Sequence, residues 1–109
     1  MKKSTIQFTI ELDNENIPQK IVWNASDHSS EKEETKSISI SIWDHQQKNT
    51  LRMDLWTNDM PVIDMKRFCI ELMAGMSQTI RTATGDNQMA EEISSLCDKL
   101  AKQVATELE

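Results

Sequence analysis

The sequence predicts an α+β fold, in which a four-stranded antiparallel sheet is followed by two C-terminal helices packed on one face of the sheet. Hydrophobic residues recur at every second position as far as Trp56, and at every third or fourth position after it. The length of 109 residues is that of one domain, so we expect residues 1–109 to form a single α+β domain.

The first two strands are indicated by alternation of apolar and polar side chains. This alternation is clear over 6–12, and a run of Asp and Asn then predicts a turn. Pro18 lacks an N–H and limits where the next strand can pair. A shorter alternation predicts the second strand over 20–24, with Ile21 and Trp23 on one face.

Residues 25–36 contain no large apolar side chain. We therefore expect a polar, mobile loop, which is long for a compact domain. Two interpretations remain open for it: a disordered connector, or a loop that contacts a partner.

The third and fourth strands, over 37–43 and 51–56, are the clearest in the sequence. Residues directly opposite each other in an antiparallel pair share a face, so the pattern predicts the register. One face pairs Ile42, Ile40 and Ile38 with Leu51, Met53 and Leu55, and the other pairs Ser41 and Ser39 with Arg52 and Asp54. Trp43 and Trp56 then lie on the polar face.

Helix boundaries are indicated by capping residues. Asp59 is a candidate N-cap, and Pro61 fits the first turn because a missing N–H costs nothing there. Gly85 ends this helix and Asp86 caps the next. Gly75 interrupts the first helix, which suggests a close backbone approach.

Each predicted helix has an apolar stripe that we expect to face inward, with the methionines as core filler. The stripes comprise Met65, Phe68, Cys69, Leu72, Met73, Met76 and Ile80 in the first helix, and Met89, Ile93, Leu96, Cys97, Leu100, Val104 and Leu108 in the second.

Composition excludes several classes of protein. A net charge of −6 and a pI near 4.9 argue against nucleic-acid binding, which needs clustered basic residues. No apolar run approaches the roughly 20 residues of a membrane span, so no direct membrane insertion is expected.

The N-terminus lacks the apolar part of a signal peptide. Cys69 and Cys97 are too few for a disulfide framework, and we expect buried packing rather than a regulatory disulfide. A cytoplasmic location is the simplest interpretation.

No residue pattern supports an enzyme. His28 and His45 each follow an aspartate, but both lie in predicted loops without a third ligand. Asp54, Asp59 and Asp64 recur every five residues, and their predicted places on a strand and near a helix start explain them. We therefore predict no catalytic residue, no cofactor and no metal site.

Two exposed tryptophans are the most promising candidates for a functional site. Trp43 and Trp56, with Arg52 and Asp54 between them, form a candidate partner-binding face, because tryptophan is a common interface anchor. The alternative is that each tryptophan packs over the sheet edge against the loop over 25–36.

One segment resembles a known family. Asp54-Leu55-Trp56-Thr57-Asn58-Asp59-Met60-Pro61-Val62 is similar to the signature segment of the gliding-motility protein GldC family. Residues 11–18, 42–44 and 50–52 are also similar, and the resemblance runs from about residue 6 to the end of the second helix.

The resemblance implies a small, non-enzymatic accessory of the Bacteroidetes gliding machinery, which is linked to a dedicated protein-secretion system. It further implies protein partners within that machinery and a functional link to the lipoprotein GldB. The alternative is a chaperone or export adaptor that binds unfolded client proteins, because four strands followed by two helices is similar to the secretion chaperone SecB. A homo-oligomer is left open.

Overall fold

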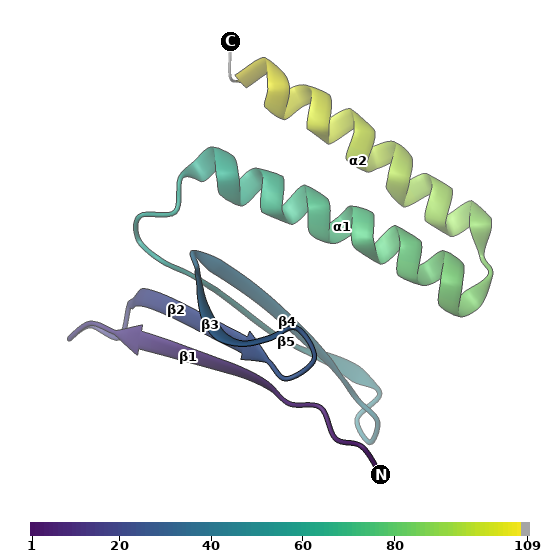
Figure 1. Cartoon of the computed structure of the whole chain (residues 1–109). Helices are drawn as coiled ribbons and strands as arrows, with labels where there is room; N and C mark the ends of the chain where they lie inside the picture. The colour runs from purple at the N-terminus through teal and green to yellow at the C-terminus, as the bar shows by residue number, and fades with distance from the viewer. Residues whose placement is uncertain (108–109) are drawn as a thin grey trace. The chain divides into compact units, whose positions relative to one another are not determined.

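The computed structural model describes residues 1–107, and within them five strands are followed by two helices (Figure 1). The α+β class, the antiparallel pairing and the two C-terminal helices are confirmed. The elements are β1 (Ile6–Leu12), β2 (Pro18–Ala25), β3 (Ser29–Thr35), β4 (Ser37–Asp44), β5 (Asn49–Trp56), α1 (Val62–Thr84) and α2 (Asn87–Glu107). The chain divides into two compact units, Met1–Met60 with the strands and Pro61–Glu109 with the helices.

The first sheet has the strand order β1-β2-β3. Phe8 pairs with Trp23 and Ile10 with Ile21, so these four side chains share one face, and Ile21 is fully buried. The predicted turn between β1 and β2 is present, because an Asp13 carboxylate oxygen accepts hydrogen bonds from backbone N–H groups within it.

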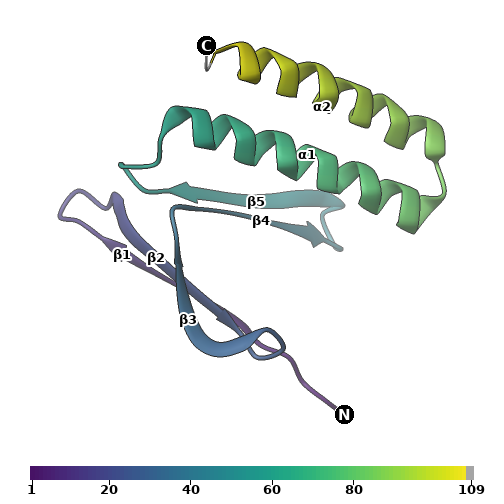
Figure 2. The ribbon, with the colours of Figure 1, turned by 45° about the horizontal axis from the view of Figure 1, so that its top comes forward.

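The expected four-stranded sheet is wrong, because β4 and β5 form a sheet of their own (Figure 2). The physical reason is that β3 pairs with the edge of β2 that the expected third strand would have used. The polar loop expected over 25–36 is wrong for the same reason, since Ser29–Thr35 is a strand. Lys36 alone separates β3 from β4.

Two charged side chains of β3 lie on the same face of the sheet as charged side chains of β1 and β2. Lys32 and Glu34 line a groove of about 390 Å³ together with Glu11 and Lys20 on one face of the sheet. Glu11 and Lys20 are directly paired across β1 and β2. Alternating charge therefore replaces alternating hydrophobicity on this strand, and main-chain pairing does not depend on apolar side chains.

The hairpin of β4 and β5 has the predicted register. Ile42 pairs with Leu51 and Ser39 with Asp54. Asp44 shapes the connecting turn, because its Oδ1 atom accepts hydrogen bonds from the backbone N–H groups of Gln46 and Gln47. The isoleucines are thereby kept together on one face and the serines on the other.

Of the residues expected to shape the helices, Gly85 and Asp86 act as predicted, and Asp59 and Gly75 do not. The N-cap of α1 is Pro61 itself, without a side-chain cap, so Asp59 does not cap this helix. A Cβ atom on Gly75 would meet nothing within 4 Å, so the expected close approach is wrong. Gly85, with φ of 74°, ends α1 as predicted, and Asp86 caps α2 by accepting the Met89 N–H at 3.0 Å.

Most of the buried residues in the two helices are small. The Ser77 hydroxyl lies 2.7 Å from the Ala90 carbonyl oxygen and 2.8 Å from the Ser94 hydroxyl. Cys97 and Val104 are buried further along α2. The inward orientation expected for Cys69, Met76, Met89 and Leu96 is wrong, since all four are exposed. Part of the predicted stripes, including Cys97 and Val104, is buried, and part stays exposed. Leu108 lies outside the described residues.

Candidate partner-binding surface

The four residues of the predicted partner-binding face lie together on the polar side of the β4–β5 hairpin. Trp43 pairs with Thr50 at one end, and Trp56 pairs with Ser37 at the other. The tryptophans are 59% and 52% exposed. Six residues of strand separate these ends, so the indoles are about 20 Å apart along the hairpin.

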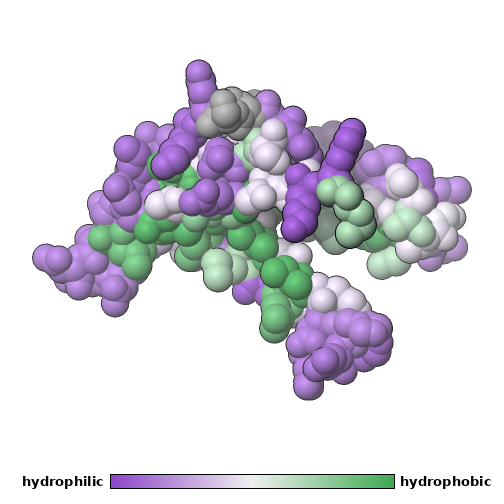
Figure 3. Space-filling model, turned by 60° about the horizontal axis from the view of Figure 1, so that its bottom comes forward, coloured by the Kyte–Doolittle hydropathy of each residue, from purple (hydrophilic) through white to green (hydrophobic). Residues whose placement is uncertain are grey.

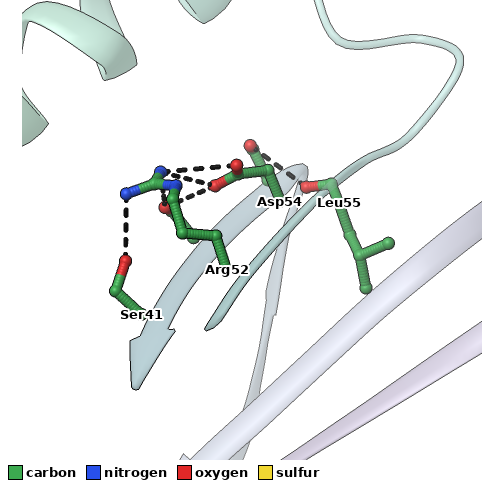
Figure 4. Close-up of polar contacts among 6 residues, drawn as sticks. Ser41, Arg52, Asp54 and Leu55 are labelled. Carbon is green, nitrogen blue, oxygen red and sulfur yellow. Dashed lines mark hydrogen bonds and ion pairs between the residues drawn. The ribbon is translucent and has the colours of Figure 1, made fainter. Parts of the chain in front are cut away.

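A hydrogen-bonded network lies on the same face of the hairpin, between the positions of the two tryptophans, and Figure 4 shows its Ser41, Arg52 and Asp54 side chains. The Arg52 guanidinium donates to the hydroxyls of Ser41 and Ser39, at 3.0 and 3.1 Å, and to the Asp54 carboxylate at 3.0 Å. Ser39 also donates to Asp54 at 2.5 Å. The Ser39 hydroxyl and then the Arg52 guanidinium hold the pKa of Asp54 below its ordinary value. Strand pairing predicted the shared face, and the structure adds these contacts.

This network makes the polar face electrically balanced and ordered before any contact. The Arg52 and Asp54 charges compensate each other, and both side chains already have partners. A surface of this kind loses little side-chain entropy on association, because its polar groups do not need to be reoriented. The tryptophans at its ends are the large apolar groups that would gain from burial.

A groove of about 310 Å³ adjoins Trp56. It is lined by Ile17 and Pro18 before and at the start of β2, and by Leu55, Trp56 and Asn58, together with Asp54 of the network. Sequence reasoning missed Ile17, Pro18 and Asn58 as parts of this surface. Their approach depends on a contact between distant segments, for which no local pattern exists, although Asn58 lies within the segment that carries the family resemblance.

A family model described as "Gliding motility-associated protein GldC-like" matches residues 18–106. The chain belongs to the GldC-like family. No curated protein and no solved structure matches it. Among the described residues, no helix is long and apolar enough to cross a membrane.

The segment 54–62, which carries the resemblance noted in the sequence, includes a turn that ties the end of β5 to the residue before β4. Thr57 is buried, and its N–H donates to the Lys36 carbonyl oxygen at 2.9 Å. The Thr57 hydroxyl donates to one Asp59 oxygen at 2.6 Å, and the Lys36 ammonium donates to the other at 3.0 Å. These two contacts lower the pKa of Asp59, and Asp59 raises the pKa of Lys36. The turn explains Thr57 and Asp59 structurally.

The two histidines of this GldC-like chain do not pair with the aspartates that precede them. The His28 ring stacks on Trp23 at 5.3 Å, and its Nε2 atom lies 3.5 Å from Glu33 of β3. His45 instead contacts Lys48. Within the part of the chain that the structure describes, no group of three His, Cys, Asp or Glu residues could hold a metal ion.

A second hydrophobic surface lies on the strand unit. Figure 3 shows hydrophobic residues gathered in a continuous stretch on the face that lies toward the bottom of Figure 1. The exposed large hydrophobic residues of β1 are Ile6, Phe8 and Leu12. The sequence predicted this strand to be half-buried, and its apolar face is more open than that.

Proposed function

We propose that this GldC-like protein is a non-enzymatic accessory of the Bacteroidetes gliding machinery, and that it acts by binding another protein through the polar face of the β4–β5 hairpin. Membership of a gliding motility-associated family supports the proposed association with the gliding machinery. The binding role is supported by the tryptophan-flanked face, which combines large exposed aromatic area with polar groups that are already bonded.

The exposure of Trp43 and Trp56 on one face is the observation that carries the proposal. Arg52 and Asp54 between them set the shape and polarity of the surface, and the groove beside Trp56 offers a recess for a partner side chain. Tryptophan and arginine are the residue types that most often dominate binding free energy at protein interfaces.

The partner that we propose is a protein component of the gliding machinery. The family resemblance implies a functional link to the lipoprotein GldB, which is not proposed as the direct contact. We place the encounter in the cytoplasm, a proposal supported by the two free thiols of Cys69 and Cys97, because reducing compartments keep cysteines unpaired.

Affinity capture with the variant Trp43→Ala/Trp56→Ala tests the proposed face. The full chain, immobilised and exposed to extract from a gliding bacterium, should retain gliding-machinery proteins identified by mass spectrometry. Each tryptophan that acts as an interface anchor contributes at least about 2 kcal/mol, so its loss weakens affinity roughly thirtyfold. The double variant should therefore lose the captured proteins while its melting temperature changes little.

The matched control is Ile42→Ala/Leu51→Ala, which removes two exposed apolar side chains from the opposite face of the same hairpin. This variant should capture the same proteins as the natural chain. Equal capture by the tryptophan variant would contradict the proposal. Retention of unfolded proteins in place of machinery components would favour the chaperone or export adaptor instead.

A further inference from the structure

The helical unit has a large apolar face that its own helix–helix contact leaves open. Met76 of α1 and Met89 and Leu96 of α2 are exposed, at 56%, 49% and 46%. On α2, Met89, Leu96 and Gln103 recur every seven residues and therefore share one face, with Ile93 and Leu100 beside them. This set defines the α2 apolar face.

A groove between the helices continues this face. It has a volume of about 350 Å³, and its apolar lining comprises Met65, Cys69, Ile70, Met73, Leu100 and Val104. The Lys66 ammonium and the Glu107 carboxylate, 2.9 Å apart, border it, and Gln103 lies at its α2 side.

The charges beside the α2 apolar face are self-complementary. Glu92 and Lys99 lie on one flank, seven residues apart, and neither forms an ion pair with any described residue. In an antiparallel helix pair, the same flank of each helix meets its counterpart. A twofold axis near Leu96 therefore brings Glu92 of each copy level with Lys99 of the other.

The same register matches the apolar groups. With the twofold axis at Leu96, residues whose numbers sum to about 192 lie within one residue of the same level, so Ile93 lies close to Leu100 of the second copy. Met89 likewise comes level with Gln103, at the groove between α1 and α2. An unbranched methionine side chain is well suited to fill an irregular apolar recess.

From these observations we infer that the helical unit associates with a second copy of itself, through an antiparallel α2–α2 contact centred on Leu96 and closed by two Glu92–Lys99 ion pairs. The contact is isologous, as expected for a twofold dimer. It uses different residues from the tryptophan-flanked face and does not depend on the proposed function.

Sedimentation equilibrium of the full chain over a wide concentration range tests this inference. The natural chain should dimerise. Glu92→Lys or Lys99→Glu places like charges together twice in each dimer and should raise the dissociation constant about tenfold. The double variant Glu92→Lys/Lys99→Glu restores both ion pairs in reversed order, and its dissociation constant should return to within about threefold of the natural value.

Asp98→Lys is the matched control, because Asp98 points away from the α2 apolar face and the change in charge is the same. It should leave the dimer unchanged, and helical circular dichroism should show that every variant is folded. A chain that stays monomeric, a dimer that ignores the single charge reversals, or a double variant that does not recover would each overturn the inference. A monomer would mean that something other than a second copy covers this face.

Discussion

A single buried threonine, Thr57, organises the turn that follows β5, within the segment 54–62. Thr57 bonds Lys36 through its backbone and Asp59 through its side chain, so one residue joins the end of β5 to the residue before β4. The sequence suggested a helix cap for Asp59, because aspartate next to a proline at a helix start is a common capping pattern. The hydroxyl of Thr57 and the ammonium of Lys36 instead take both carboxylate oxygens.

Thr57→Val tests this arrangement at the level of one hydroxyl group. Valine has nearly the same shape but cannot donate to Asp59, so the pKa of Asp59 should rise toward its ordinary value. Carboxyl-detected NMR titration measures this change. Thr50→Val, on an exposed position of the same hairpin, should leave the Asp59 titration where it is. An Asp59 pKa that does not respond to Thr57→Val would contradict the role given to the hydroxyl.

At the scale of elements, periodicity predicted the strands and helices whose hydrophobic residues have a clear repeat. The hairpin register follows from isoleucines that alternate with serines, and this pattern alone places Trp43, Trp56, Arg52 and Asp54 on one face. Strand β3 was missed because its residues are almost all charged or hydroxylated. Its pairing with β2 uses main-chain groups and places Glu33 and Glu34 opposite Trp23 and Val22, so the strand has no hydrophobic repeat of its own.

The helical stripes show a different limit of sequence reasoning. Spacing correctly gave the period of the large apolar residues, but it could not tell which partner they face. The Ser77 hydroxyl and the Ala90 carbonyl oxygen, for example, are joined by a buried hydrogen bond between the helices. Such residues carry no signal in a hydrophobic pattern.

Gly75→Ala tests the finding that no neighbour approaches this point of α1. An added Cβ atom meets nothing within 4 Å, and alanine favours a helix by about 0.5–1 kcal/mol relative to glycine. The variant should be more stable by that amount in urea unfolding followed by helical circular dichroism. Gly85→Ala is the contrasting control, since a φ of 74° is strained for alanine and the variant should be less stable. A loss of stability in Gly75→Ala would reveal a neighbour at this position.

At the scale of the whole molecule, the two units can be followed separately. All three tryptophans, Trp23, Trp43 and Trp56, lie in the strand unit, whereas the helical circular dichroism signal comes from the other unit. The change of period after Trp56 predicted that helices follow the strands, within a single domain. The split of the strands into two sheets depends on which edge of β2 is free, and that is a property of the assembled backbone.

Acid should destabilise the strand unit in a way that tryptophan fluorescence detects. Asp54 and Asp59 both have a lowered pKa in the folded chain. A carboxyl group of this kind stabilises the fold above its unfolded pKa, near 3.8, and loses that contribution as the pH falls through the lower folded value. Urea midpoints read by fluorescence should therefore decrease as the pH is lowered below about 4.

The variant Asp54→Asn/Asp59→Asn is the control for this acid dependence. Neither asparagine titrates, so the part of the pH dependence that comes from these two carboxyl groups should disappear. The variant should start from a lower midpoint at neutral pH, because the Arg52 and Lys36 charges lose their partners. An unchanged slope in acid would show that other groups cause the effect.

The small residues between α1 and α2 have a consequence for how much of this protein a cell must make. In the described part of the two helices only Ser77, Ala90, Cys97 and Val104 are buried, so the helix pair by itself removes a limited apolar area from water. Isolated helices are marginal in water, and most of their stability comes from packing of a large apolar face. If a second copy supplies that packing, the folded fraction of the helical unit depends on the abundance of the chain. A modest change in gene dosage would then change the fraction of helical units that are folded.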